Sequence, residues 1–401
     1  MNTNEIILTK TKEVMDYAIK MRRYFHENPE VSSQEFNTSK VLKEEIESLG
    51  LSINEVGKTG FYSILDTGKP GKTIGIRSDI DALPIQENEN NLRGKRLVCS
   101  KKEGVMHACG HDGHMATLLS VAKILANNKD LINGKIIFIF EEGEEAGSGI
   151  RDMIEALKSL QIDAIYGTHL TSFMDTGEIS LDSGPVMAGC GLVMLNVVGR
   201  GGHGSRPDLS INPIFAAASI INGLATAWAN QIDVTKTVTL GLGSINGGSG
   251  LVPNVIPDKV EITGTLRFFD MDEGHKAMEV IKNVSQNIAM ANKCSIEVND
   301  MYGVVANPVV NDKHLSEIAQ RGLNDILPNS LKNDVRWFAS ESFSLYRQLA
   351  PSLFAFVGTK NEESGSGAEH HNEYFDLDEN SLIYAIVATL KFIHNYQKTN
   401  E

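Results

Sequence analysis

Short segments that are apolar at almost every position limit the folds open to this chain more than any other feature. Residues 135–140 and 163–167 form two such segments, and stretches with helical spacing of apolar residues lie at about 113–126 and 149–160. A strand that is apolar at consecutive positions is typical of a sheet covered on both faces. The sequence therefore predicts an α/β fold in which helices flank a mixed sheet.

The middle third of the chain has a different pattern. It predicts the order strand, helix, strand, strand, helix, strand, which is the ferredoxin-like α+β plan. A chain of 401 residues also favours two hydrophobic cores over one. We therefore predict a discontinuous first domain, residues 1–186 and 301–401, and an inserted second domain, residues 187–300. The predicted elements of the insert are 191–198, 212–228, 234–245, 260–269, 272–291 and 295–298.

Charge and composition narrow the class of partner. The formal net charge is -14, and such a surface repels nucleic acid and anionic membranes. A small molecule or peptide is the expected partner. The four cysteines are too few and too widely spaced for a disulfide scaffold. We see no signal peptide and no apolar run that could span a bilayer, and we expect a cytoplasmic protein.

The segment from Met106 to His114 is the most informative for function. It holds three histidines, one cysteine and one aspartate within eight residues, just before a predicted helix. The Cys109 thiolate and the His111 imidazole are close enough to bind one metal if the loop turns tightly, and Gly110 permits that turn. Any one of these side chains alone would more often be structural, but the whole cluster indicates a metal site.

Further candidate ligands lie in three places: after each of two predicted strands, and in a segment near the C-terminus. The acidic run 141–145 comes directly after an apolar strand, and ligand sites in open α/β sheets gather at such ends. Its four carboxylates would repel one another without a cation. His169 ends another apolar strand, and the pair 370–371 lies in a polar segment. A solvated acidic loop and structural histidines are the alternatives.

Together these groups could supply thiolate, imidazole and carboxylate ligands to two divalent metals. Two metals would polarise a carbonyl and make hydroxide from water. One carboxylate of the pair Glu144 and Glu145 could then act as general base.

Several segments resemble the dinuclear-metal amidohydrolases and peptidases grouped as aminoacylases and carboxypeptidases. The branch with hippurate hydrolases and indoleacetyl-amino acid hydrolases is the most similar. The stretch from Met106 to His114 is the most specific match, and all matches occur in the family order over nearly the whole chain. The resemblance implies a zinc-exopeptidase-like catalytic domain and a dimerisation or lid role for the insert. The matching residues are 77–84, 106–114, 144–145, 199–203, 253–257 and 371–376.

The resemblance also implies roles for single residues. Glu144 matches the general base, which takes a proton from the metal-bound water. Two divalent ions are implied, zinc or manganese, and related enzymes also accept nickel or cobalt. Cys109 is placed to bridge both ions. The full set of matching metal ligands is Cys109, His111, Glu145, His169 and His371.

Three residues of the insert match positions that act on the substrate. In relatives, the counterpart of His203 reaches the active site of a neighbouring protomer and stabilises the oxyanion. Asn254 and Arg267 match residues that hold the substrate near its carboxylate, and a guanidinium suits bidentate carboxylate recognition. Without the resemblance, Arg267 would be interpreted as a surface arginine.

Three departures from the usual family pattern bear on this interpretation. Residues 141–143 are Glu-Glu-Gly instead of Gln-Pro-Ala, and the added charge could tighten cation binding or shift the pKa of the base. Ser342 replaces the aspartate of a usual Glu-Asp-Phe, which removes a carboxylate. Glu373 replaces the proline that usually follows the last ligand. His371 gives the better register for that ligand, and His370 is the alternative.

These features predict an enzyme that hydrolyses the amide bond of N-acyl amino acids or small peptides. We expect a homodimer or a higher homo-oligomer. The second hypothesis, motivated by the changes at 141–143 and Ser342, is a metal-binding or interaction protein of the same fold with impaired catalysis.

Overall fold

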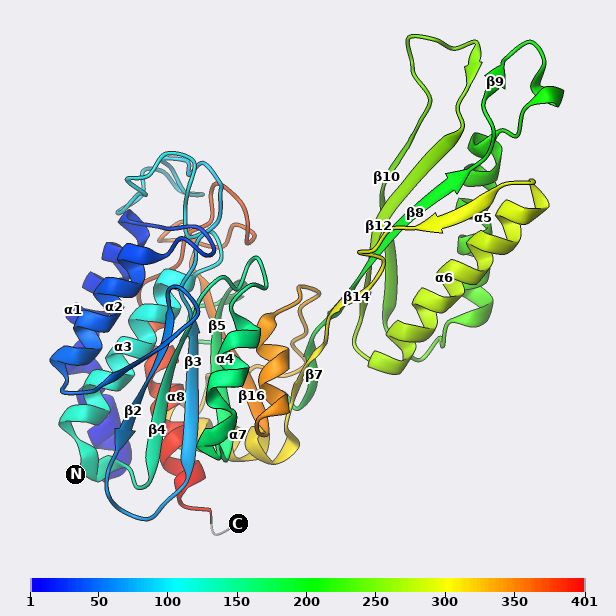
Figure 1. Cartoon of the computed structure of the whole chain (residues 1–401). Helices are drawn as coiled ribbons and strands as arrows, with labels where there is room; N and C mark the ends of the chain where they lie inside the picture. The colour runs from blue at the N-terminus through cyan, green and yellow to red at the C-terminus, as the bar shows by residue number, and fades with distance from the viewer. Residues whose placement is uncertain (1, 400–401) are drawn as a thin grey trace. The chain divides into compact units, whose positions relative to one another are not determined.

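A seven-stranded mixed sheet lies at the centre of the first of two units in this computed structural model, which describes residues 2–399 (Figure 1). The first unit takes in the described residues of Met1–Gly184, Val310–Val335 and Leu345–Glu401. The second unit takes in Pro185–Val309 and Arg336–Ser344. Each unit has its own buried apolar cluster.

Four strands of the first sheet run parallel, so their carboxyl ends lie at the same end of the sheet. These are β3, β4, β5 and β16, and the remaining strands pair antiparallel at the two sides. The apolar segments predicted as strands correspond to β4 and β5. In spatial order the strands are β1 (Ile53–Val56), β2 (Gly60–Asp66), β4 (Lys135–Glu141), β3 (Thr73–Asp79), β5 (Ala164–Asp175), β16 (Ser352–Lys360) and β6 (Ile179–Ser180).

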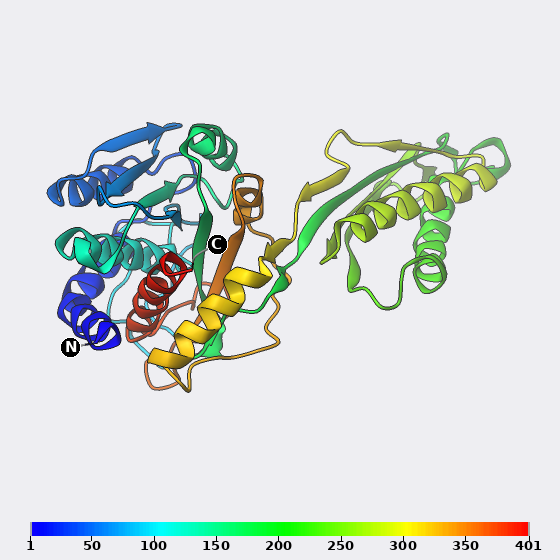
Figure 2. The ribbon, with the colours of Figure 1, turned by 90° about the horizontal axis from the view of Figure 1, so that it is seen from below.

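Helices cover both faces of this sheet, as expected from its continuously apolar strands. Phe138 of β4 points into the core that α1, α3 and α8 also line, whereas its neighbours Ile137 and Ile139 lie outside that core yet are equally buried. Figure 2 shows α3 and α8 on one face and α4 on the other. The helices are α1 (Thr3–Glu27), α2 (Phe36–Ser48), α3 (His111–Asn127), α4 (Ile150–Leu157), α7 (Lys313–Ile326) and α8 (Ser381–Gln397).

The second unit is an antiparallel sheet with two helices packed on it. Its spatial order β10-β12-β8-β13 and its chain order β8, α5, β10, β12, α6, β13 together make the predicted ferredoxin-like plan. A further strand, β14, also pairs with β8 and was not predicted. The elements are β8 (Gly189–Val198), α5 (Pro213–Gln231), β10 (Val238–Gly247), β12 (Lys259–Phe268), α6 (Met271–Ala291), β13 (Ser295–Val298) and β14 (Gly303–Ala306).

The remaining strands form two short two-stranded sheets. In one, β9 (Gly202–His203) pairs with β11 (Val255–Ile256), and in the other, β7 (Gly184–Met187) pairs with β15 (Val309–Asn311). Within residues 2–399, no helix combines the length and the apolar character needed to cross a membrane.

Candidate metal centre

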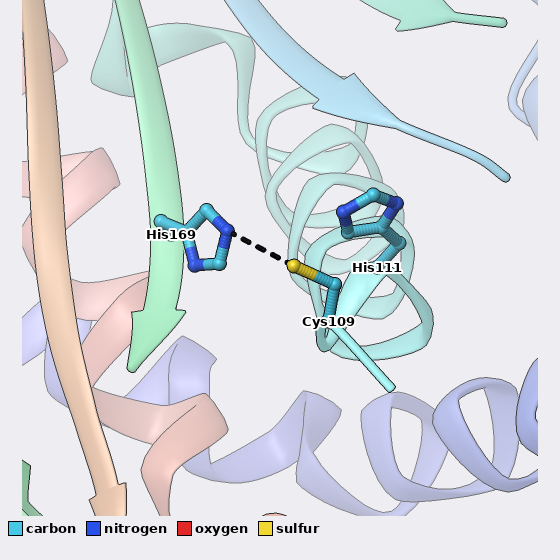
Figure 3. Close-up of side chains that lie close together, drawn as sticks. All are labelled: Cys109, His111 and His169. Carbon is cyan, nitrogen blue, oxygen red and sulfur yellow. Dashed lines mark hydrogen bonds between the residues drawn. The ribbon is translucent and has the colours of Figure 1, made fainter. Parts of the chain in front are cut away.

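The predicted ligands of the first unit come together around Cys109. Within residues 2–399, four groups of side chains have metal-binding atoms that all lie within 4.8 Å of one another. One is Asp79, His111 and His114, and the other three consist of predicted site residues. Cys109 belongs to two of them, an arrangement suited to a thiolate that contacts two ions. Figure 3 shows the side chains of Cys109, His111 and His169 close together. The three groups of predicted site residues are Cys109, His111 and His169; Cys109, Glu145 and His371; and His111, Glu144 and Glu145.

The backbone explains how residues from distant segments converge. Gly110 has a left-handed φ of 86°, which lets the chain turn from Cys109 into α3, so that His111 is the first residue of the helix. His371 also has a left-handed φ, of 59°. Its backbone N–H donates to the carbonyl of Ala108 at 2.9 Å, which fastens this C-terminal loop to the Cys109 segment.

Hydrogen bonds fix which nitrogen of each histidine faces the cluster. His111 Nδ1 lies 2.9 Å from the carbonyl oxygen of Asp81 and 3.2 Å from its Oδ1. His169 Nδ1 lies 2.9 Å from the carbonyl oxygen of Leu170. Because a carbonyl can only accept, both Nδ1 atoms carry hydrogen, and Nε2 is the nitrogen that each neutral imidazole would offer to a metal. His169 Nε2 lies 3.6 Å from Cys109 Sγ, the dashed contact in Figure 3.

The donor set fits divalent metal ions. No described residue makes a hydrogen bond with His111 Nε2 or Glu145 Oε1, although both atoms are buried, and buried polar atoms normally have partners. Burial and the nearby Glu145 raise the pKa of the Cys109 thiol well above its usual range. A divalent cation would supply the positive charge that a thiolate needs here. Thiolate, imidazole and carboxylate together suit zinc-like ions.

The candidate base, Glu144, lies in the turn after β4. Two carboxylates from other segments hold this turn. Asp81 Oδ2 accepts from the backbone N–H of Glu145 at 3.0 Å, and Glu35 Oε1 accepts from that of Gly143 at 2.8 Å. Sequence reasoning missed Asp81, which contacts both His111 and this turn. Its position just past a predicted strand was the available signal.

The other two glutamates of the acidic run have their own donors. Glu141 accepts from Arg77 Nε at 2.9 Å and from the Tyr346 hydroxyl at 2.8 Å. Glu142 accepts from the backbone N–H groups of Lys58 and Gly60. Burial alone would raise the pKa of Glu142, but these and other hydrogen bonds lower it. Neither of these two carboxylates therefore needs a metal ion: Glu141 is paired with the Arg77 cation and Glu142 with backbone donors.

Three more residues of the Cys109 segment are buried. Asp112 is buried against Arg22 Nε at 2.9 Å. His114 Nδ1 lies 2.7 Å from Asp79 Oδ1, and its Nε2 accepts from the backbone N–H of Leu170, so both ring nitrogens have partners within the protein. His107 is buried, which lowers its pKa to about 4.

The adjacent histidines near the C-terminus have different surroundings. His371 Nε2 lies 3.3 Å from Glu145 Oε1 and within reach of Cys109. His370 Nε2 instead accepts from the backbone N–H of Ser172 at 3.1 Å, and burial lowers its pKa to about 3. This geometry favours the register that places His371 among the ligands.

The three substrate-related candidates lie in the second unit, outside this cluster. His203 is exposed in β9, where its Nδ1 accepts from the backbone N–H of Ser205 at 3.1 Å. The carbonyl of Asn254 accepts from the backbone N–H of Gly204. Arg267 lies in β12 and donates to the Ser340 hydroxyl at 3.2 Å. A cavity of about 690 Å³ is lined by residues 199–203 and 255–258.

Comparison with known proteins identifies the family. Residues 75–395 match the model of Peptidase family M20/M25/M40. The chain is 36% identical over 387 residues to thermostable carboxypeptidase 2 of Saccharolobus solfataricus, covering 95% of this chain and 96% of that protein. It is 34% identical over 348 residues to hippurate hydrolase of Campylobacter jejuni, covering 86% and 88% respectively.

A solved structure agrees with this assignment. The YXEP protein of Bacillus subtilis, described as a dinuclear metal-binding peptidase of the M20 family, superposes with a TM-score of 0.83 at 30% identity. The superposition covers 97% of this chain and 99% of that one. In sequence, fold and the clustering of metal-binding side chains, the chain belongs to peptidase family M20/M25/M40.

Proposed function

We propose that this enzyme hydrolyses the amide bond of N-acyl amino acids or small peptides at a centre of two divalent ions. The observation that carries the proposal is the convergence of thiolate, imidazole and carboxylate donors around Cys109, with Glu144 beside them. Relatives named as a carboxypeptidase and a hippurate hydrolase support this substrate class.

The ions would be held by the five residues that the sequence predicted: Cys109, His111, Glu145, His169 and His371. We expect both ions to be zinc or manganese, and nickel and cobalt are further candidates. When bound, such ions polarise a scissile carbonyl and acidify water.

Glu144 is the proposed general base. Its carboxylate lies with His111 and Glu145, where it can take a proton from the attacking water and pass it to the leaving amine. The hydrogen bonds of Asp81 and Glu35 to the backbone on either side hold the main chain from which this carboxylate extends. A fixed position matters because a base acts only within hydrogen-bond reach of the proton it moves.

The second unit is proposed to supply substrate contacts in a homodimer. We expect His203 to stabilise the oxyanion in the site of a neighbouring protomer, as its counterpart does in relatives. The residue is exposed, and Nδ1 is the ring nitrogen that binds Ser205, which leaves Nε2 for this role. Asn254 and Arg267 are the expected contacts of the substrate carboxylate.

The alternative of a metal-binding protein with impaired catalysis loses part of its motivation. Glu141 accepts a hydrogen bond from Arg77, and Glu142 accepts from backbone N–H groups. These bonds hold both carboxylates away from the general-base position of Glu144, so the unusual residues do not interfere with catalysis there.

A substrate panel tests the proposal. Metal-stripped protein is reloaded with Zn²⁺, Mn²⁺, Co²⁺ or Ni²⁺ and assayed with hippurate, N-acetyl amino acids, indoleacetyl-amino acids and dipeptides, with kcat/KM as the readout. We expect at least one substrate to be hydrolysed only when metal is present. No turnover of any substrate with any of the four metals would favour the metal-binding alternative.

A further inference from the structure

Glu141, the last residue of β4, is a buried carboxylate with no part in the mechanism proposed above. Its exposed fraction is 0%, and in the parallel register of the sheet it lies beside Asp79, the last residue of β3. Asp79 is buried to the same extent. Two ionised carboxylates at neighbouring buried positions require a cation between them.

Arg77 provides that cation. Its Nε donates to Glu141 Oε2 at 2.9 Å, and its Nη1 donates to Asp79 Oδ2 at 2.8 Å. The Tyr346 hydroxyl donates to the same Glu141 oxygen at 2.8 Å. Because the guanidinium is planar and both carboxylates are bound to it, the positions of Glu141 and Asp79 are fixed relative to each other.

Asp79 connects this pair of carboxylates to the candidate metal centre. Its Oδ1 accepts from His114 Nδ1 at 2.7 Å, and its Oδ2 lies 3.5 Å from His111 Nε2, the atom that faces the cluster. Glu141 shares the positive charge of Arg77 with Asp79. Asp79 therefore presents more negative potential to His111 than it would if Arg77 were paired with Asp79 and a neutral side chain.

We propose that Glu141 is a positioning residue of the metal centre, which orients Asp79 through Arg77 and adds negative charge that favours cation binding at His111. This inference rests on the proposed function, because it assumes divalent ions at the Cys109 cluster. The inference also explains what the change from the usual glutamine to Glu141 does: with glutamine at this position, the chain would bind the ions more weakly.

Zinc binding to the full-length, metal-stripped protein tests the inference. Affinity for Zn²⁺ alone is measured by competition with a chromophoric chelator, so no turnover is needed. Glu141→Gln keeps the shape of the side chain and removes its charge, and we expect zinc affinity to fall roughly tenfold or more, as is typical when a group that supports a ligand is changed. The matched control is Tyr346→Phe, which removes the other hydrogen bond to the same oxygen without changing charge. Its zinc affinity should stay close to that of the unaltered protein.

Unchanged zinc affinity in folded Glu141→Gln protein would overturn the inference, and so would an equal loss in Tyr346→Phe. Thermal unfolding of the metal-free proteins shows whether each variant is folded. If Glu141→Gln does not fold, Glu141→Asp decides: the shorter side chain draws the carboxylate back from Arg77, so a fall in zinc affinity supports the inference and unchanged affinity contradicts it. Absence of zinc binding by the unaltered protein is a separate result, because it would overturn the proposed function itself.

Discussion

Glu142 and Glu144 lie two residues apart in one turn, yet their carboxylates have different surroundings. Glu142 is bound by backbone N–H groups of Lys58 and Gly60, whereas Glu144 lies with the candidate ligands His111 and Glu145. The sequence predicted the role of Glu144 but not the surroundings of Glu142, because the donors to Glu142 lie more than 80 residues away and leave no local pattern.

Substituting these two glutamates should therefore affect different properties, catalysis for Glu144 and stability for Glu142. We expect Glu144→Gln to reduce kcat by a factor on the order of 10²–10⁴, the usual contribution of a general base, while bound metal stays unchanged. Glu142→Gln should instead lower the free energy of unfolding by about 1–3 kcal/mol, because backbone donors lose their acceptor, and should leave kcat nearly unaltered. Steady-state kinetics, metal analysis and urea unfolding measure the three quantities. Undiminished kcat in Glu144→Gln would remove Glu144 from its proposed role.

The adjacent histidines allow a similar comparison. His371→Ala should weaken zinc binding by about tenfold or more, since it removes a proposed ligand. His370→Ala should mainly lower the Tm, because this partly buried ring packs against Phe375 and accepts from the backbone of Ser172. Chelator competition and thermal unfolding of both variants distinguish the two roles. The reverse pattern would make His370 the ligand.

At the scale of elements, apolar runs carried most of the information. β4 and β5 were predicted from such runs, and the helix and strand order of the second unit followed from its periodicity. β14 was not predicted, because its residues Gly-Val-Val-Ala do not alternate between polar and apolar as the four residues of β13 do. The role of Asp81 was missed for another reason: its contacts with His111 and Glu145 arise only when β3, α3 and the turn after β4 meet.

Strand β10 bears on the expected oligomer. It is the last strand at one side of the second sheet, and its ten residues include no charged side chain. Natural proteins usually protect such an edge with charge or by pairing it. The proposed dimer would pair this edge with a second copy.

Charge placed on this edge should disrupt the dimer. Ile245 in β10 is 50% exposed, and we expect Ile245→Glu to shift the protein towards monomer in sedimentation velocity. Val298 in β13 is 41% exposed at the opposite side of the same sheet, so Val298→Glu is the matched control and should leave the dimer intact. A dimer that is equally stable in both variants would place the interface elsewhere.

At the scale of the whole molecule, the candidate residues divide between the two units. Glu144 belongs to the first unit and His203 to the second. If His203 serves a neighbouring protomer, a heterodimer of His203→Ala and Glu144→Ala chains has one site with both groups intact. Mixing the two inactive variants should then restore partial activity in the hydrolysis assay. No recovery, with heterodimers confirmed, would exclude a role for His203 in the partner's site.

The most direct test of the central claim is a metal titration in which bound ions per chain and turnover are measured together. Metal-stripped protein is titrated with Zn²⁺ or Mn²⁺ in the presence of the best substrate from the panel. We expect two ions to bind per chain, turnover to rise with their occupancy, and Cys109→Ala protein to bind fewer than two ions and to lack turnover. Undiminished turnover by fully stripped protein, or full metal binding and turnover by Cys109→Ala, would contradict the account.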